Sequence, residues 1–411
     1  MDSVSTVLGE PSPFSEVSEQ RMRGSNQSGL RAHNERAVLS LIRRHGVMAK
    51  ADIARRTGLS PQTASVIMRA LEAEELVLRD EPRRGRVGQP SIPMRLNPDG
   101  AFALGLKIGR RSAELVLMDF VGVIRARRRM TYAYPRLREV LDFTGRSVAD
   151  IEEGLDARAK ARLSGLGIAM PDGIWNWAEE VGAPPGAMSE WQGVDITAEV
   201  AAATGHSVHR ANDATAACAA ENVFGSTGFS DYVYVFVGAF VGGGIVIDGD
   251  LVKGPTGNAG ALGSMPVPKP GGGTDQLINA ASIHVLEKMA REAGREASEI
   301  WVRDAAWDEF GGELDRWIAE AAAGLAHAAV AAASIYDFEA VVIDGSFPPS
   351  VRARLVAATS EALSRVRREG LSPLVVSAGT IGSSAREIGS ASLPFFARFL
   401  LDQRARYVDK G

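Results

Sequence analysis

The sequence predicts an α/β protein in which a small, mainly helical N-terminal module precedes a larger body of two related lobes. Three observations predict this organisation. Positive charge is concentrated between residues 21 and 98, which carry 15 Lys or Arg against 7 Asp or Glu. From residue 101 onward, segments typical of strands and helices alternate to the end of the chain. A pattern of three strands, a helix and a further strand begins near Ala101 and again near Tyr232, which indicates two related lobes.

Length and composition set the limits within which the chain is interpreted. Its 411 residues suffice for two or three domains with a large core, and 45% apolar with 23% charged residues is typical of soluble globular proteins. The excess of +8 in residues 21–98, against a net charge of −4 overall, leaves −12 for the remainder. This asymmetry favours a nucleic-acid-binding module attached to an acidic body. No run of 18 apolar residues occurs and the N-terminus is acidic, so we expect a cytoplasmic protein without a membrane partner.

The first elements of the N-terminal module follow a low-complexity beginning. Residues 1–30 are rich in Ser, Glu, Gly and Pro without periodicity, and we expect a disordered leader there. Residues 34–45 place apolar side chains on one face and end at Gly46, which predicts a helix. A second, short helix is expected from about residue 50 to residue 57, ended by Gly58.

The third helix has the strongest local signals in the chain. Ser60 is a favoured N-cap residue, and Pro61 stands at the first helical position. An apolar stripe at helical spacing faces the core, formed by Ala64, Ile67, Met68 and Leu71. The opposite face is polar and carries Gln62, Thr63, Ser65 and Arg69.

Two short strands, at residues 76–78 and 92–96, enclose a basic, glycine-containing tip at residues 83–91. Together with the three helices they predict a winged helix-turn-helix over residues 31–98. Polar residues at the start of the third helix are placed to reach base edges, whereas arginines there and in the wing are suited to phosphates. The residues expected to contact DNA are Arg55, Arg56, Ser60, Gln62, Thr63, Ser65, Arg69, Arg83, Arg84, Arg86 and Gln89. The alternative is a protein-docking domain whose arginines are merely solvated.

The body is predicted from residue 101 onward. Strands are expected at residues 102–108, 113–120, 122–134, 165–170, 207–210, 232–237, 244–247, 340–343 and 374–376. Helices are expected at residues 196–204, 214–224, 313–336 and 351–368.

Three segments of the body carry a family resemblance: residues 165–175 (GLGIAMPDGIW), 208–226 (VHRANDATAACAAENVFGS) and 237–267, with a weaker one at 379–395. In these segments the chain resembles the ROK family of repressors, open reading frames and sugar kinases. With the N-terminal module included, the resemblance runs from about Arg31 and is to the family's transcriptional repressors.

The resemblance implies a body of the actin/hexokinase type, with a sugar between its two lobes, and dimerising repressors. It divides the body into lobe one at residues 99–210, completed by residues 386–411, and lobe two at residues 211–385.

Departures from the family's kinases affect the phosphate loops. Where those kinases have an Asp-x-Gly-Gly-Thr loop, this chain has Lys107 for the carboxylate and Arg110 for the second glycine. In the second loop the threonine is replaced by Ala239, and Phe240 stands where backbone approaches phosphate. We therefore expect neither ATP binding nor any cofactor.

The expected ligand-binding residues are Pro171, Asp172, Asn212 and Asp213. By resemblance, Asp213 corresponds to the catalytic base and forms the sugar-binding pair with Asn212. Without a phosphoryl donor, such a carboxylate serves binding only. The alternative is that Asn212 and Asp213 cap the Ala-rich helix that follows, and both roles are compatible.

Other family anchors are missing. The glutamate and histidine that hold the sugar in the family are replaced by Ala261 and Ser264. The family's zinc site needs that histidine and three cysteines, whereas this chain has one cysteine, Cys218, interpreted as a core residue. No metal is expected. A tryptophan cluster near the cleft fits packing between lobes or stacking on a ligand, and comprises Trp175, Trp177 and Trp191.

The sequence thus predicts a DNA-binding transcriptional regulator, a repressor, whose kinase-like body is catalytically inactive and senses a sugar or sugar derivative. The expected partners are a pseudo-palindromic double-stranded operator, a carbohydrate effector and further copies of the chain in a homodimer or higher homo-oligomer. One alternative is an active ATP-dependent sugar kinase with an appended DNA-binding domain. Another is a constitutive DNA-binding scaffold without a small-molecule input.

Overall fold

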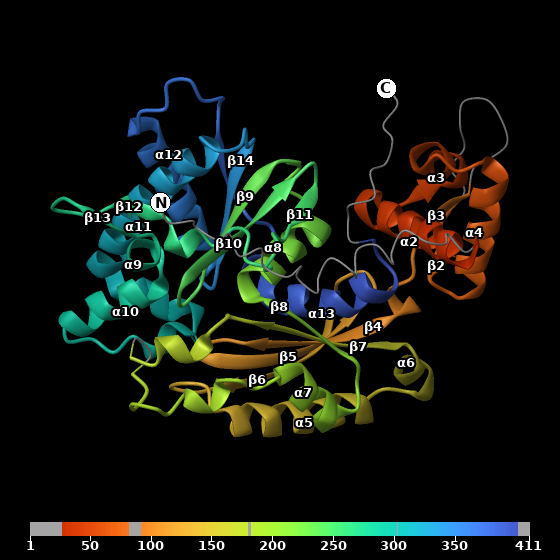
Figure 1. Cartoon of the computed structure of the whole chain (residues 1–411), viewed down its shortest axis with the longest axis horizontal. Helices are drawn as coiled ribbons and strands as arrows, with labels where there is room; N and C mark the ends of the chain where they lie inside the picture. Colours follow the sequence, from red (N-terminus) through yellow and green to blue (C-terminus); the bar gives the residue numbers. More distant parts are fainter. Residues whose placement is uncertain (1–26, 82–91, 180–181, 302, 402–411) are drawn as a thin grey trace, which may run out of the picture.

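The computed structural model describes residues 27–401 except 82–91, 180–181 and 302. It contains an N-terminal module and two lobes, each built on a five-stranded sheet (Figure 1). The module, drawn in red and orange, lies beside the region where the two lobes meet. Most of the expected leader, residues 1–26, lies outside the described residues.

The N-terminal module has the helix order predicted from the sequence. Its elements are α2 (Gln27–His45), β1 (Met48–Ala49), α3 (Lys50–Thr57), α4 (Pro61–Ala73), β2 (Val77–Arg79) and β3 (Pro93–Leu96). The three strands form one antiparallel sheet in the order β1-β3-β2. The prediction for the third helix is confirmed, because Ser60 caps α4 and Pro61 is its first residue. Strand β1 was not predicted, since two residues are too few to show a pattern.

The two lobes repeat one sheet topology. The first sheet consists of β4 (Phe102–Ile108), β5 (Ser112–Asp119), β6 (Ile124–Thr131), β7 (Leu163–Met170) and β8 (Val208–Asn212). The second consists of β9 (Tyr232–Val237), β10 (Val241–Ile247), β11 (Asp250–Val252), β14 (Ala340–Gly345) and β15 (Val375–Ala378). Their strand orders are β6-β5-β4-β7-β8 and β11-β10-β9-β14-β15. Each begins with an antiparallel meander and continues with two parallel strands, which confirms the predicted relation between the lobes.

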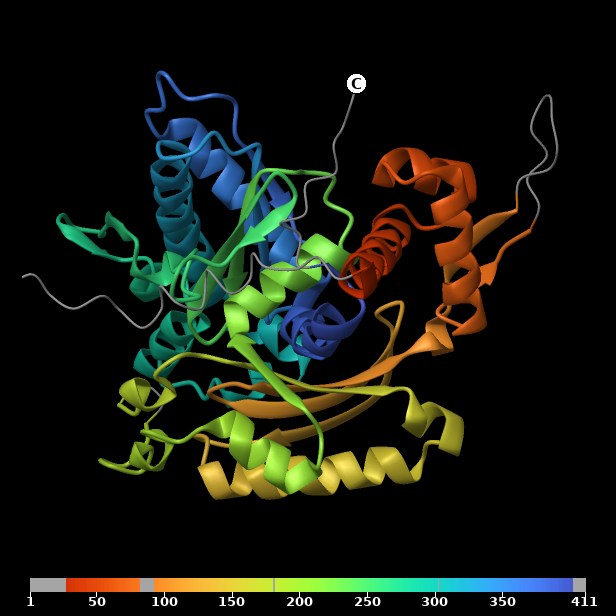
Figure 2. The same ribbon diagram turned by 45° about the vertical axis from the view of Figure 1, so that its right-hand side comes forward.

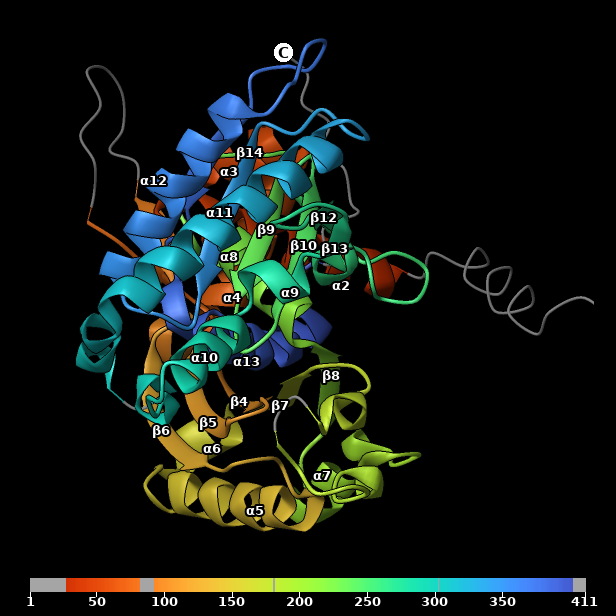
Figure 3. The same cartoon turned by 90° about the vertical axis from the view of Figure 1, so that its left-hand side faces the viewer.

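Helices cover both sheets and separate them (Figure 3). The helices of the body are α5 (Leu137–Glu153), α6 (Ala157–Ala161), α7 (Ile196–Thr204), α8 (Asp213–Phe224), α9 (Ile278–Ala281), α10 (Ile283–Glu292), α11 (Gly311–Ala333), α12 (Pro349–Arg365) and α13 (Ala385–Arg398). A small hairpin in lobe two is formed by β12 (Pro266–Pro268) and β13 (Thr274–Gln276). Short 3-10 helices lie at Pro98–Gly100, Ile174–Trp177, Ser189–Trp191, Leu262–Ser264, Ser298–Trp301, Asp304–Phe310 and Gly382–Ser384.

Helix α13 lies between the lobes and packs closely against both. On one side, a Cβ atom added to Gly167 of β7 would lie 1.8 Å from the carbonyl oxygen of Ser390. On the other side, a Cβ atom added to Gly389 of α13 would lie 2.0 Å from the carbonyl oxygen of Ala216 in α8. Pro394 has no N–H to donate to the Ser390 carbonyl four residues earlier, yet the helix continues to Arg398. At both contacts, α13 can approach its neighbour this closely only because the glycine has no side chain.

The N-terminal module shares a hydrophobic core with the body. Val38 and Ile42 of α2 belong to the same buried cluster as Val116 of β5, Phe395 of α13 and Leu400. A module joined in this way is held against the body, because separating it would expose apolar surface to water.

Several boundaries differ from those expected from the sequence. Helix α2 begins at Gln27 rather than at residue 34, and its first turns are exposed and include an ion pair from Arg31 to Glu35. An apolar stripe does not mark such solvent-facing turns. Strand β6 covers Ile124–Thr131 rather than residues 122–134. No helix in the described part of the chain combines the length and apolar character needed to cross a lipid bilayer.

Candidate functional site

The turn between α3 and α4 fixes the start of the exposed helix. Gly58 ends α3 in the left-handed region with φ of 67°, which favours glycine. Two residues later, the Ser60 hydroxyl accepts a hydrogen bond from the Thr63 backbone N–H at 3.1 Å. The Ser60 and Thr63 hydroxyl oxygens are also 2.8 Å apart. Ser60, expected as a DNA contact, therefore has a structural role in capping α4.

The polar face of α4 points away from the core of the module. Gln62, Thr63 and Arg69 are exposed, and Ser65 is half-buried. Val66 lies among them with 45% of its surface exposed. The sequence analysis missed this valine, although its spacing of three and four residues from Thr63 and Gln62 places it on the same face. An exposed apolar group beside amide, hydroxyl and guanidinium groups suits the major groove, where a thymine methyl group is one of the features read.

The arginines of the described part of the module differ in their local partners. Arg55 forms an ion pair with Asp52, whereas the Arg69 guanidinium donates to the carbonyl of Ser65 at 3.3 Å. Arg56 lies 3.4 Å from the His45 ring nitrogen. Partial burial, followed by the charges of Arg56 and Arg44, lowers the pKa of His45. The expected wing contacts Arg83, Arg84, Arg86 and Gln89 lie outside the described residues.

In the body, an ion pair joins β4 to β5 next to the turn that, by the resemblance, corresponds to the first phosphate loop of the kinases. The Lys107 ammonium nitrogen is 2.8 Å from Glu114 Oε2, and their side chains are 7% and 6% exposed. Lys107 also donates to the Ser112 hydroxyl at 2.9 Å. Burial lowers the pKa of Lys107. Burial alone would raise the pKa of Glu114, but the Lys107 charge, the hydrogen bonds from Lys107 and Ser112 and the charge of Arg386 together outweigh it, and the pKa falls.

A second obstruction is a stack of side chains from both lobes. The Arg110 guanidinium carbon lies 4.0 Å from the Phe240 ring centroid and 5.2 Å from that of Trp177. The Trp177 and Phe240 centroids are 4.7 Å apart, and Phe240 in turn lies 5.5 Å from the His284 ring. Arg110 and Trp177 come from lobe one, and Phe240 comes from lobe two. The stack joins the lobes at the residues that depart from the family's phosphate loops.

The backbone of the second loop, at Gly238 and Ala239, is hydrogen-bonded to a neighbouring helix. The carbonyl oxygens of Gly238 and Ala239 accept hydrogen bonds from the backbone N–H groups of Ile283 and His284, at 3.0 and 3.1 Å. These donors belong to the first turn of α10, where unpaired N–H groups would otherwise be available to an anion.

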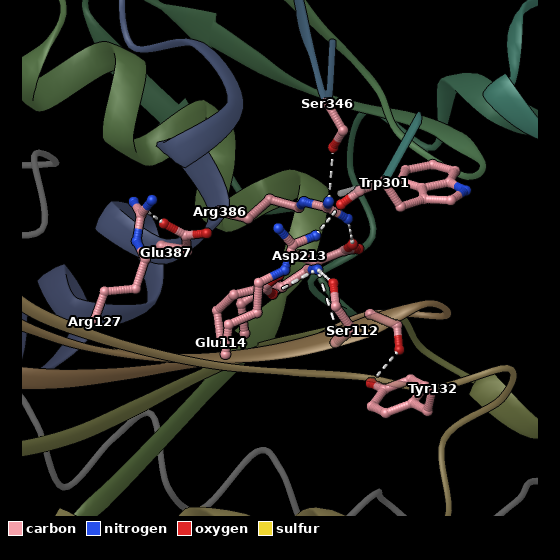
Figure 4. Close-up of polar contacts among 12 residues, drawn as sticks. Ser112, Glu114, Arg127, Tyr132, Asp213, Trp301, Ser346, Arg386 and Glu387 are labelled. Carbon is pink, nitrogen blue, oxygen red and sulfur yellow. Dashed lines mark hydrogen bonds and ion pairs between the residues drawn. The ribbon is translucent and has the colours of Figure 1, made fainter. Parts of the chain in front are cut away.

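Asp213 faces this filled side of the cleft. Its carboxylate lies 3.1 Å from Arg386 Nη1 of α13, and the two side chains are 15% and 12% exposed. Arg386 also donates to the Ser346 hydroxyl at 2.9 Å and lies over the Phe236 ring (Figure 4). Arg386 is 173 residues from Asp213 along the chain, so local sequence gave no sign of this contact.

Asn212 and Asp172 lie together on a different side of α8. The Asn212 side-chain oxygen accepts from the N–H groups of Ala214 and Thr215, which confirms the capping alternative for this residue. Its amide nitrogen donates to Asp172 at 3.2 Å, and Arg210 also pairs with Asp172. Both Asn212 and Asp172 line a cavity of about 530 Å³, whereas Asp213 and the buried Pro171 do not. The structure thus divides the expected ligand residues between two environments.

The remaining candidate side chains have packing roles. Trp191 is buried in lobe one and donates to the carbonyl of Pro135 at 3.1 Å. Cys218 is buried in α8, and a Cβ atom added to Gly244 would lie 2.5 Å from its Cβ. Burial and then the charge of Glu221 raise the pKa of this thiol. His206 lies 2.7 Å from Glu152.

Comparison with known proteins identifies both parts of the chain. The ROK family model matches residues 103–394, and a model described as winged helix-turn-helix DNA-binding matches residues 31–77. Uncharacterized protein y4fQ of Sinorhizobium fredii is 28% identical over 376 residues, or 89% of this chain and 91% of that protein. The xylose repressor of Caldicellulosiruptor bescii is 26% identical over 271 residues, or 65% of this chain and 66% of the repressor.

A solved structure shares the whole architecture. It is described as a ROK family transcriptional regulator, a homologue of the E. coli MLC protein, and aligns with a TM-score of 0.63 at 21% sequence identity. The alignment covers 90% of this chain and 97% of that one. The shared fold extends from the N-terminal module through both lobes.

Proposed function

The chain belongs to the ROK family, and from this membership and its winged helix-turn-helix module we propose that it is a ligand-responsive transcriptional repressor that does not phosphorylate its ligand. The observation that carries the proposal is the exposed face of α4, where Gln62, Thr63, Val66 and Arg69 lie along one side of a capped helix. Such a face supplies hydrogen bonds, an apolar contact and a cation, which are the groups that read a major groove.

The absence of kinase activity is inferred from the filled phosphate positions. Phosphoryl transfer depends on backbone and cations that cradle the nucleotide phosphates. Here Lys107 is engaged with Glu114, and Arg110 packs on the ring of Phe240 and beside that of Trp177. These contacts support a body that binds without catalysing transfer.

A carbohydrate is the effector class that the relatives suggest. The name of one relative, the xylose repressor, associates that protein with a pentose. We carry over only the class, because the sugar anchors of the family are replaced here by Ala261 and Ser264. Two copies of the chain would present two α4 helices to successive major grooves, which predicts a pseudo-palindromic operator.

The proposal is tested by selecting binding sequences from a random pool of DNA duplexes with the full chain. We expect enrichment of a sequence with two related half-sites, and an affinity that falls with salt as phosphate contacts are screened. A Gln62→Ala/Thr63→Ala double variant should bind the selected duplex more weakly by about 1–3 kcal/mol per lost base contact. Arg367→Ala, in an exposed part of lobe two, is the matched control. Failure to enrich any sequence would contradict the proposal.

The active sugar kinase remains the second candidate, because Asp213 is present where the family's kinases have their catalytic base. The two candidates are separated by a coupled assay with Mg–ATP and a panel of hexoses and xylose. We expect no turnover. Turnover that is lost in Asp213→Asn would favour the kinase.

A further inference from the structure

The cavity beside Asn212 lies where three parts of the protein meet. Its volume is about 530 Å³, which is within the range of about 300–1,000 Å³ typical of small-molecule sites. Lobe one contributes β8, lobe two contributes α8 and the segment after β11, and the N-terminal module contributes Arg36 of α2. Figure 2 shows α2 in red beside α8 in green and the end of α13 in blue. A smaller cavity beside it along α2 measures about 20 Å³.

The wall of the cavity combines hydrogen-bonding groups with an excess of positive charge. Three cationic side chains line it against a single carboxylate: Arg36, Arg210 and Lys253 against Asp172. Hydroxyl and amide groups are supplied by Asn212, Thr215, Asn222 and Thr256. Apolar surface comes from α8 and from Leu393 and Phe396 of α13. A ligand with several hydroxyl groups and one negative group would satisfy this lining.

This cavity is separate from the filled part of the interlobe cleft. The residues that line it include neither Asp213 nor Phe240 nor the replaced anchors Ala261 and Ser264. Asp213 is instead engaged with Arg386 on the other side of the start of α8. A ligand in the cavity would therefore contact Asn212 but not Asp213, the other member of the sugar-binding pair that the resemblance implies.

The cavity also contacts the link between the body and the DNA-binding module. The Arg36 guanidinium donates to the carbonyl oxygen of Phe396, in the last turn of α13, at 2.5 Å, and to that of Leu400, just beyond the helix, at 2.9 Å. Leu401 donates in turn to the Ser40 hydroxyl of α2 at 2.9 Å. A negative group placed beside Arg36 competes with these carbonyls for its donors.

We propose that this cavity is the effector site, that it binds a sugar-sized molecule carrying one anionic group, and that the bound molecule alters the position of the DNA-binding module through Arg36. The inference rests on the proposed function as a ligand-responsive repressor and assigns its input to a specific site. The anionic group is a carboxylate or a phosphate, and the two sources share the same recognition chemistry.

The test is calorimetric titration of the full chain with three probes: glucuronate, glucose 6-phosphate and neutral glucose. We expect at least one of the two anions to bind at least tenfold more tightly than glucose. Arg210→Gln and Lys253→Gln should each weaken that binding at least tenfold, because each removes a cation from the wall. Asp213→Asn should leave it within twofold, because Asp213 lies outside the cavity. The melting temperature of each unliganded variant establishes that it is folded.

Three results would overturn the proposal. They are that neither anion binds at concentrations below 10 mM, that neutral glucose binds more tightly than both anions, or that the Arg210→Gln and Lys253→Gln variants bind the anion as tightly as the unmodified chain does. The coupling is measured separately, as the affinity for the selected DNA duplex with and without the saturating anion. We expect at least a fivefold change, and an unchanged affinity would remove the role of Arg36. If DNA is bound sequence-specifically while no anion binds, this inference fails and the assignment of DNA binding stands.

Discussion

The exposed face of α4 and the interlobe cleft both contain polar and charged side chains, but they use them in opposite ways. On α4, Gln62, Thr63 and Arg69 face solvent. In the cleft, Lys107 and Glu114 are almost fully buried and paired with each other. A buried charge that has its partner stabilises a defined geometry, whereas an exposed polar group is available to an incoming molecule.

This difference in the exposure of charged groups indicates that the two regions have different roles. A kinase cleft needs accessible groups that meet phosphate, and here the corresponding groups contact other protein groups. Charge therefore has a structural role in the cleft and a recognition role on the module. The following predictions separate these two roles.

The largest effect is expected for Glu114→Leu. This change leaves the Lys107 ammonium buried without its carboxylate, and should lower the free energy of unfolding by about 3–5 kcal/mol. Urea unfolding at pH 7 measures it. The Lys107→Met/Glu114→Leu double variant is the control, because it removes both charges and should lose much less. A single variant as stable as the double one would show that the pair is not structural.

A smaller effect, in binding rather than stability, is expected for Val66→Asp. The new carboxylate would face the DNA phosphates, so affinity for the selected duplex should fall at least tenfold, about 1.4 kcal/mol. Stability should change by less than about 0.5 kcal/mol, since Val66 is 45% exposed. Val123, a 54% exposed valine of lobe one, provides the matched control Val123→Asp. Fluorescence anisotropy should show unchanged DNA binding for this control.

Ser60→Ala tests an exposed residue of the module whose side chain forms a hydrogen bond within the protein. Loss of the cap on α4 should cost about 1 kcal/mol in the free energy of unfolding. Ser65→Ala, on the same helix, should cost less than about 0.5 kcal/mol. Chemical denaturation of both variants measures the difference. Equal stability of the two variants would mean that the Ser60 cap contributes nothing.

The smallest effect concerns His45, whose pKa is lowered in the folded protein by burial and by Arg56 and Arg44. As pH falls below the ordinary value of about 6.5, the unfolded chain binds a proton before the folded one does. Stability should therefore decrease as pH falls from 7.5 through the folded-state pKa. His45→Gln should remove this component, as measured by urea midpoints at pH 7.5, 6.5 and 5.5. Parallel pH curves for the two proteins would contradict the assignment.

Local signals were sufficient to predict the module. The start of helix α4 was predicted to the residue because its cap, its first proline and its apolar stripe lie within a few positions of one another. The repeated lobes were predicted from the succession of strands, since the same succession of β-rich segments forms a sheet of the same topology in each lobe. Helix α13 was not predicted, because Pro394 inside it is usually a sign that a helix ends.

The cleft was predicted only in part. The replacements at Lys107 and Arg110 are visible in the sequence, but their partners depend on pairing in three dimensions. Glu114 lies directly opposite Lys107 in the β4–β5 register, so the hairpin itself could have indicated that contact. The contact of Arg386 with Asp213 joins segments that the chain brings together only after both lobes are complete.

Helix α13 connects the two regions that the predictions treat separately. Near its first turn Arg386 holds Asp213, and near its last turn the Phe396 carbonyl accepts from Arg36 of the DNA-binding module. Its 14 residues span about 21 Å. The glycine contacts at Gly167 and Gly389 leave no room for this rod to slide between its neighbours. Rotation would carry Gly389 away from the Ala216 carbonyl and bring a larger neighbour against that carbonyl, so α13 is a rigid connection that fixes the distance between the Asp213 contact and α2.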